Sequence, residues 1–225
     1  MRATIGWLAT AAFVLGPTLA FLRVVPGLVG FILFALGGLI AFIIALSGIV
    51  SALRGRGLGR SGIALVTAAV FVVLASRGFG VPSINDFSTD TSDPPTFRHA
   101  TALPANTGRD MSYPSAFADI QKTCCADLGP ARLSVPPAEA LARAERVARI
   151  MPGWEVTSVD REAANLEAIA TTYLFGFHDD IVVRVRPEGT GSRVDIRSKS
   201  RDGKGDIGAN ASRIRAFLKA VQELK

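Results

Sequence analysis

Residues 181–200, IVVRVRPEGTGSRVDIRSKS, decide the fold of the C-terminal part of the chain. Apolar and polar residues alternate in both halves of this stretch, as in β-strands with one buried face. Ile181, Val183 and Val185 share one face, and Val194 and Ile196 follow the same alternation. The turn-forming residues PEGTGS separate the two runs, so the stretch predicts an antiparallel β-hairpin.

The register of this hairpin follows from the requirement that the two apolar faces coincide. A register that places Arg184 opposite Asp195 meets this requirement and pairs opposite charges. The same register places Arg186 opposite Arg193, which is unfavourable unless an anion bridges the two side chains.

Further elements are expected on both sides of the hairpin. Helical spacing of apolar residues predicts helices over residues 137–150 and 206–221, the second with Asp206 as its N-cap. We predict an α+β domain over residues 84–225, with an antiparallel sheet of four to five strands covered by helices on one face. The other strands are expected at residues 154–160 and 166–175, with a short strand near residues 131–135.

The front of the chain has a different composition. Residues 1–84 contain no Asp or Glu, so all 19 acidic residues lie in the remainder. A helix needs about 20 apolar residues to cross a bilayer. We predict a transmembrane anchor over residues 1–83, in which small residues such as Gly30 and Gly37 let the helices pack closely within the bundle or, alternatively, let the protein self-associate. Its three spans cover about residues 4–22, 27–51 and 61–80; the third is short, and Arg60 and Arg77 extend it by snorkelling.

The arginines of the anchor predict its orientation. Arg54, Arg56 and Arg60 lie in one short loop, and cytoplasmic loops are rich in basic residues. Residues 84–225 are therefore expected outside the cytoplasm. Residues 1–20 also fit a cleavable signal peptide ending at Ala20, and its removal would leave two spans and the same placement of the domain. No ionisable residue lies deep in a span, which counts against a transporter or channel.

The charge distribution also bears on partners. The chain has a net charge of +6 and a pI near 9.9, values that often indicate nucleic-acid binding. Here the excess charge lies wholly on the anchor, because the basic and acidic residues of the C-terminal domain balance. We therefore expect the lipid bilayer as a partner and no nucleic acid.

The C-terminal half resembles a known family. Residues 177–218, FHDDIVVRVRPEGTGSRVDIRSKSRDGKGDIGANASRIRAFL, are similar to the signature of the domain of unknown function 1499 (DUF1499) family. INDFSTDTSDPPTF, residues 84–97, resembles the start of that family's domain, and Cys124-Cys125 stand where the family pattern has a Tyr-Pro-Asp block. The resemblance implies a bacterial inner-membrane protein with a periplasmic domain. It implies no activity.

The arginines of the hairpin form the main candidate site. Arginine binds carboxylates and phosphates through paired hydrogen bonds, so an anionic small molecule or lipid is the expected ligand. The alternative is a solvated face neutralised by carboxylates such as Asp195, Glu167 and those of residues 86–93. The candidate ligand-binding residues are Arg184, Arg186, Arg193, Arg197, Arg201, Asp180 and Asn210.

Other chemistry has weaker support. No nucleophile elbow, phosphate loop or dinucleotide fingerprint is present, and we expect no cofactor, no metal site and a binding module rather than an enzyme. The alternatives are an envelope hydrolase or isomerase that uses Asp179 or Asp180 with a neighbouring arginine, and a structural assembly factor. Cys124 and Cys125 are adjacent, so they form either a strained vicinal disulfide, separate thiols or intermolecular bonds.

Overall fold

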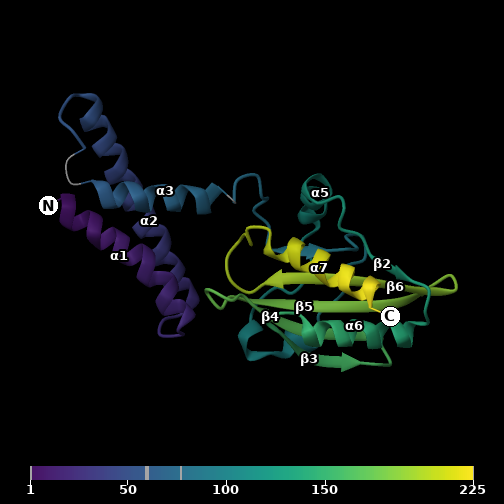
Figure 1. The fold of residues 1–225 in the computed structure, drawn as a ribbon. Helices are drawn as coiled ribbons and strands as arrows, with labels where there is room; N and C mark the ends of the chain where they lie inside the picture. The colour runs from purple at the N-terminus through teal and green to yellow at the C-terminus, as the bar shows by residue number, and fades with distance from the viewer. Residues whose placement is uncertain (1, 59–60, 77, 225) are drawn as a thin grey trace. The chain divides into compact units, whose positions relative to one another are not determined.

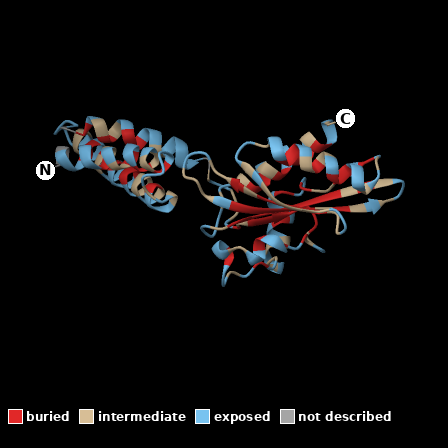
Figure 2. Cartoon of the chain, turned by 90° about the horizontal axis from the view of Figure 1, so that it is seen from below, coloured by how far each residue is buried: buried red, intermediate tan, exposed pale blue. Residues whose placement is uncertain are grey.

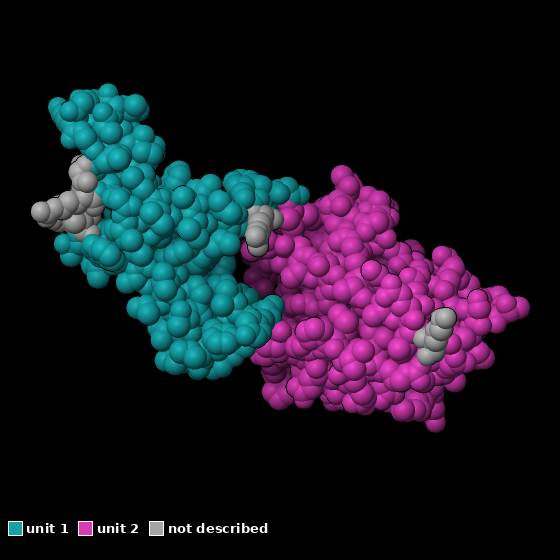
Figure 3. Space-filling model, viewed as in Figure 1, with its two compact units in different colours: residues 1–80, 172–177 teal, residues 81–171, 178–225 magenta. Residues whose placement is uncertain are grey.

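The computed structural model describes residues 2–58, 61–76 and 78–224, which form two compact units (Figure 1). The first unit comprises residues 1–80 and the short segment 172–177, and the second comprises residues 81–171 and 178–225 (Figure 3). Each unit has its own buried apolar cluster.

The first unit is helical, with α1 (Arg2–Phe21), α2 (Gly27–Leu53) and α3 (Gly62–Ser76). Two stretches are long and apolar enough to be candidate membrane spans, Thr4–Phe21 and Gly27–Leu53. At 15 residues, α3 is shorter than the roughly 20 that a crossing needs. The prediction of three spans is therefore not confirmed. Arg60 and Arg77, expected to extend the third span, lie outside the described residues.

Glycines let α1 and α2 pack so closely that their backbones are in contact. A Cβ atom on Gly37 would lie 2.5 Å from the carbonyl oxygen of Ala9 and 2.5 Å from the amide nitrogen of Phe13. Gly16 and Gly30 make a second close approach along the same pair of helices. The expected close packing through small residues is confirmed for these helices.

The segment 172–177 folds as a tight turn within the first unit. The carbonyl oxygen of Thr172 accepts a hydrogen bond from the Gly176 amide, and Gly176 has a φ of 67°. The rings of Phe175 and Phe177 lie 5.5 and 6.1 Å from that of Phe31 on α2. The predicted strand over residues 166–175 is therefore too long, because this turn ends it at Thr171.

The second unit contains one antiparallel sheet. Its strand order is β1-β6-β5-β4-β3, and β2 also pairs with β6. The prediction of four to five strands is too low, because the three-residue strand β1 was not expected. The strands are β1 (Asp86–Ser88), β2 (Ala131–Leu133), β3 (Trp154–Asp160), β4 (Asn165–Thr171), β5 (His178–Glu188) and β6 (Gly191–Ser200).

The predicted register of the β5–β6 hairpin is confirmed. Arg184 pairs with Asp195, and Arg186 pairs with Arg193. The connection is shorter than the six residues expected, because Glu188 pairs with Gly191 and leaves only Gly189 and Thr190 between the strands. Gly189 has a φ of 58°, which suits so tight a turn.

Both faces of the sheet are covered, although helices were expected on one face only. Helices α6 (Pro137–Ile150) and α7 (Ala209–Glu223) pack on the face that carries Ile181, Val183 and Ile196. On the other face Phe97, Ala100 and Met111 pack against Val182. These residues belong to an irregular segment that includes the short helices α4 (His99–Ala102) and η1 (Pro104–Asn106). Figure 2 shows the buried strands between more exposed layers.

Helix α5 (Ser115–Cys124) was not predicted, and it protects the edge of the sheet. The Gln121 amide accepts a hydrogen bond from the Ser88 N–H at 2.9 Å and donates one to the Ser88 carbonyl oxygen at 2.5 Å. These are the backbone groups that an edge strand would otherwise leave open to another chain.

An arginine and aspartate network as the candidate functional site

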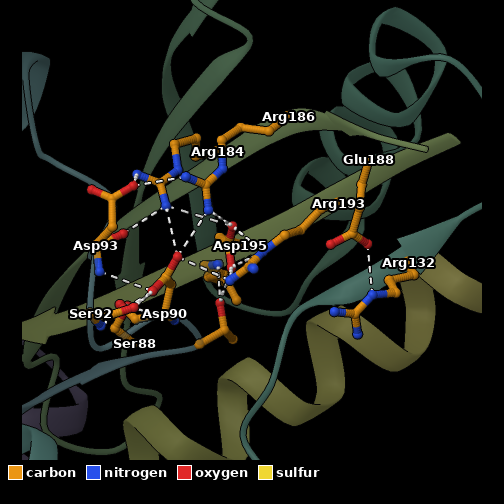
Figure 4. Close-up of polar contacts among 12 residues, drawn as sticks. Ser88, Asp90, Ser92, Asp93, Arg132, Arg184, Arg186, Glu188, Arg193 and Asp195 are labelled. Carbon is orange, nitrogen blue, oxygen red and sulfur yellow. Dashed lines mark hydrogen bonds and ion pairs between the residues drawn. The ribbon is translucent and has the colours of Figure 1, made fainter.

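The like-charged pair Arg186 and Arg193 is bridged by carboxylates of the protein itself (Figure 4). Asp90 Oδ2 lies 2.9 Å from Arg186 Nη2 and 3.0 Å from Arg193 Nη2. Asp195 Oδ2 lies 3.1 Å from Arg186 Nη2 and 2.9 Å from Arg193 Nε. The bridging anion that the register requires is therefore present within the chain.

Asp90 is held in position by a local turn. Its Oδ1 accepts hydrogen bonds from the Ser92 hydroxyl at 2.8 Å and from the backbone N–H of Asp93 at 2.9 Å. Burial opposes ionisation of Asp90, but the hydrogen bonds from Asp93, Ser92 and Arg186 outweigh it and lower the pKa of this carboxyl. Asp90 therefore stays charged at neutral pH.

Asp93 forms the solvent-exposed rim of the network. Its side chain is 65% exposed, yet its Oδ2 lies 2.8 Å from Arg186 Nη1 and 3.2 Å from Arg184 Nη1. Among the described residues, Arg184 Nε is a buried nitrogen without a hydrogen-bond partner. We call Arg184, Arg186 and Arg193 with Asp90, Asp93 and Asp195 the hairpin cluster. Three guanidinium groups balance three carboxylates in it.

Arg197, another predicted ligand residue, is buried in a separate contact. It is 2% exposed and donates hydrogen bonds to Asp86 from Nε at 2.9 Å and from Nη2 at 2.7 Å. Lys199 Nζ lies 3.0 Å from the same carboxylate. The Arg197 guanidinium also stacks on the Phe97 ring, 4.8 Å from its centroid. One buried carboxylate thus serves two cations.

Asp180 and Arg201 form a third group. Arg201 donates to Asp180 from Nη2 at 2.6 Å and from Nε at 3.1 Å, and Asp180 is fully buried. Asn106 Nδ2 donates to Asp180 at 3.0 Å, and Arg109 Nη1 lies 3.5 Å from it. Asn106 and Arg109 had not been identified from the sequence, because they lie in an irregular segment without periodicity or motif.

Asp179 points to the opposite face of the sheet from Asp180. Its Oδ2 lies 2.6 Å from Arg213 Nη2 of α7. Two carboxylates on opposite faces, each paired with arginine, do not share a proton as an acid–base pair does. The alternative of an enzyme that uses Asp179 or Asp180 gains no support from this geometry.

Asn210 joins α7 to β6 within this region. It is fully buried, its Oδ1 accepts from Ser198 Oγ at 2.5 Å, and its Nδ2 donates to Ser200 Oγ at 2.9 Å. Asp206 was expected to be the N-cap of this helix, but Gly208 occupies that position. The Asp206 carboxylate nevertheless accepts from the backbone N–H groups of Gly208 at 2.9 Å and Asn210 at 2.6 Å.

The sequence suggested Glu167 as a carboxylate that neutralises the arginines of the hairpin, but in the structure it has a different role. Its carboxylate accepts three hydrogen bonds from backbone N–H groups at the start of α4, those of Arg98 at 2.7 Å, His99 at 2.8 Å and Ala100 at 2.7 Å. A negative charge is favourable at this end of a helical turn. Glu167 therefore fixes the irregular segment to the sheet.

The two cysteines are free thiols, and their sulfur atoms lie 2.6 Å apart. Desolvation, together with the adjacent Cys125 thiol, raises the pKa of Cys124 to about 11. Within residues 2–58, 61–76 and 78–224, no three His, Cys, Asp or Glu side chains are grouped so that they could hold a metal ion.

Comparisons with known proteins identify similarity over the second unit. The model of the family described as "Protein of unknown function (DUF1499)" matches residues 86–221. No curated protein sequence matches the chain. A solved structure described as "Crystal structure of Ara h 8.0201" aligns at 12% identity with a TM-score of 0.31, over 41% of this chain and 90% of its own. That similarity is too weak to assign a fold or a function.

Proposed function

The chain belongs to the DUF1499 family, which is described as of unknown function, so we propose its function from its own geometry: a membrane-anchored, non-enzymatic module that binds an anionic ligand. The two apolar helices α1 and α2 are the candidate anchor. The ligand site is the exposed rim of the hairpin cluster, where Arg184 and Arg186 meet Asp93.

The exposure of Asp93 is the observation that carries this proposal. Its carboxylate is the most exposed acid of the cluster, at 65%, whereas the side chains of Asp90 and Asp195 are 7% and 0% exposed. An incoming phosphate or carboxylate that displaced Asp93 would meet Arg184 and Arg186 together, and arginine forks suit such planar or tetrahedral anions. Arg197, Arg201, Asp180 and Asn210 stay predicted ligand residues; all four make internal contacts, so the rim is the part of the site that we propose first.

Titration of the full-length protein in detergent with inorganic phosphate tests this proposal. The Arg184→Gln/Arg186→Gln variant should lose measurable phosphate binding. Asp93→Asn should bind phosphate about two- to fivefold more tightly, because an exposed ion pair of roughly 0.2–1 kcal/mol no longer competes with the ligand. Asp119→Asn is the matched control, because Asp119 is an exposed carboxylate paired with Lys122 on α5. Unchanged binding by the double variant would refute the rim site.

We further propose that the anchor lies in a bacterial inner membrane with the C-terminal domain in the periplasm. The proposal rests on Arg54 and Arg56, which follow α2 closely, and on the excess of basic residues in cytoplasmic loops. A C-terminal tag should be cleaved by protease added to spheroplasts, and N-terminal sequencing of the purified chain distinguishes an anchor from a signal peptide cleaved after Ala20. Cleavage of the tag only after lysis would contradict this orientation and would place the C-terminal domain in the cytoplasm.

A further inference from the structure

The C-terminal part of α2 borders a hollow that is half polar. Its volume is about 350 Å³. Serine and arginine side chains supply its polar lining, and aliphatic side chains, Ile43 among them, supply its apolar lining. The residues that matter here are Leu46, Ser47, Val50, Ser51, Arg54 and Arg56.

A second hollow adjoins the first and is apolar. Its volume is about 430 Å³, it lies between α2 and α3, and it shares Leu46 with the first. Phe42 and Ala45 line it from α2, and Ala69 and Val72 line it from α3. The small alanine side chains leave a groove that lipid-facing residues do not fill.

The arginines at the polar end have no carboxylate of the first unit to pair with. Residues 1–80 and 172–177 contain no Asp or Glu. Arg54 and Arg56 are exposed. Their counter-charge in this unit must therefore come from a bound anion or from solvent, and anionic lipids concentrate at the membrane surface that basic juxtamembrane segments face.

The dimensions of the two hollows match one lipid leaflet. Phe42 lies 12 positions before Arg54, a rise of about 18 Å at 1.5 Å per residue. One leaflet of a hydrocarbon core is about 15 Å thick, half of roughly 30 Å. An acyl chain that extends from a headgroup at Arg54 therefore reaches the depth of the groove that Ala45 and Ala69 line.

We propose that these two hollows together form a binding site for an anionic phospholipid. Arg54, Arg56 and Ser51 hold the phosphate-containing headgroup, and the groove between α2 and α3 holds one acyl chain. The proposal rests on the membrane anchoring proposed above, but it concerns a different site from the hairpin cluster.

Native mass spectrometry of the full-length protein tests the headgroup part of this site. The protein is delipidated in detergent and then incubated with equal amounts of phosphatidylglycerol and phosphatidylcholine that carry the same acyl chains. We expect about a 25-fold preference for phosphatidylglycerol, roughly fivefold for each arginine. Arg54→Gln/Arg56→Gln should abolish the preference. The control Arg98→Gln/Arg161→Gln removes two exposed cations from the second unit and should preserve it.

A second pair of variants tests the acyl-chain part. Ala69 is exposed and lines the groove, so Ala69→Trp should fill the groove and reduce the retention of both lipids at least fivefold. Val66→Trp is the control, because Val66 is also exposed on α3 but does not line the groove.

Three results would overturn the proposal. They are an unchanged lipid preference in the Arg54/Arg56 variant, full lipid retention in Ala69→Trp, and no retention of either lipid by the parent. Full lipid retention in Ala69→Trp would mean that the groove holds no acyl chain and that lipids are attracted only by their headgroups. Phosphate titration of the hairpin cluster is a separate measurement, so failure of this lipid site is distinguishable from failure of the proposed function.

Discussion

Asp86 carries an unusual share of the buried charge in the second unit. It is fully buried and neutralises both Arg197 and Lys199. Asp86→Asn keeps the shape of the side chain but leaves two buried cations without a counter-charge, so we expect a loss of about 3–5 kcal/mol in the free energy of unfolding. Urea unfolding followed by Trp154 fluorescence in a Trp7→Phe background measures this loss. The exposed control Asp119→Asn should change stability by less than about 0.5 kcal/mol; an equal effect of the two substitutions would contradict the role of Asp86.

Asp90 should give the second unit an acid-sensitive component of stability. The pKa of Asp90 is lower in the folded chain than its usual value of about 3.9, so the folded state favours the carboxylate. The stabilisation is complete above about pH 4 and is lost as pH falls through the lowered pKa. Asp90→Asn should therefore be less stable than the parent at pH 7, by about 1–3 kcal/mol, and the difference should shrink below pH 4. Unfolding midpoints measured from pH 2.5 to pH 7 check this, and a constant difference would count against it.

At the residue scale, the sequence predicts some contacts of the candidate site and not others. The pairs Arg184–Asp195 and Arg186–Arg193 were predicted because a period of two leaves few registers that keep both apolar faces together. The need for a bridging anion followed as well, but its source, Asp90, depends on where residues 86–93 lie. Charge alone indicated docking of that segment without specifying contacts. Arg109 and Asn106 carry no local pattern, so only the tertiary structure shows that they contact Asp180.

The start of helix α7 depends on an acceptor rather than on a charge. Burial raises the pKa of Asp206, although the N–H groups of Asn210 and Gly208 oppose this effect. A raised pKa means that the folded state favours the protonated form, so this stabilisation is complete below about pH 4 and is lost as pH rises through the raised value. Asp206→Asn keeps an oxygen acceptor and should be at least as stable as the parent at pH 7. Asp206→Ala should lose about 1 kcal/mol. Trp154 fluorescence in urea measures both, and equal losses would show that the charge matters more than the acceptor.

At the scale of elements, periodic segments were predicted and irregular ones were not. Helix α6 and the hairpin strands have sustained apolar periods, so their existence and type followed from the sequence. Strand β1 has only three residues, and α5 is fixed by the Gln121 contacts with Ser88. Such elements exist because of their tertiary partners, which a local window does not contain. The cover on the second face of the sheet was missed for the same reason.

At the scale of the whole molecule, each unit has its own core. The core of the first unit lies between helices, and that of the second lies between the sheet and helices α6 and α7. We therefore expect the two units to unfold in separate transitions. The two tryptophans report on them separately, Trp7 on α1 and Trp154 on β3. Ile196 is fully buried on the interior strand β6, so Ile196→Ala should cost about 2–5 kcal/mol and shift only the Trp154 transition.

Gly37→Leu gives the reciprocal test, because any Cβ at this position would meet the backbone of Ala9 and Phe13 on α1. It should separate α1 from α2 and lower the midpoint of the Trp7 transition in denaturing detergent, while the Trp154 transition stays in place. The matched control is Leu36→Ala, because Leu36 is 52% exposed beside Gly37 on the same helix. Each transition is recorded in a chain that carries only one of the two tryptophans. If Gly37→Leu and Ile196→Ala each moved both transitions, the two units would unfold as one cooperative structure, and the candidate anchor would contribute to the stability of the second unit.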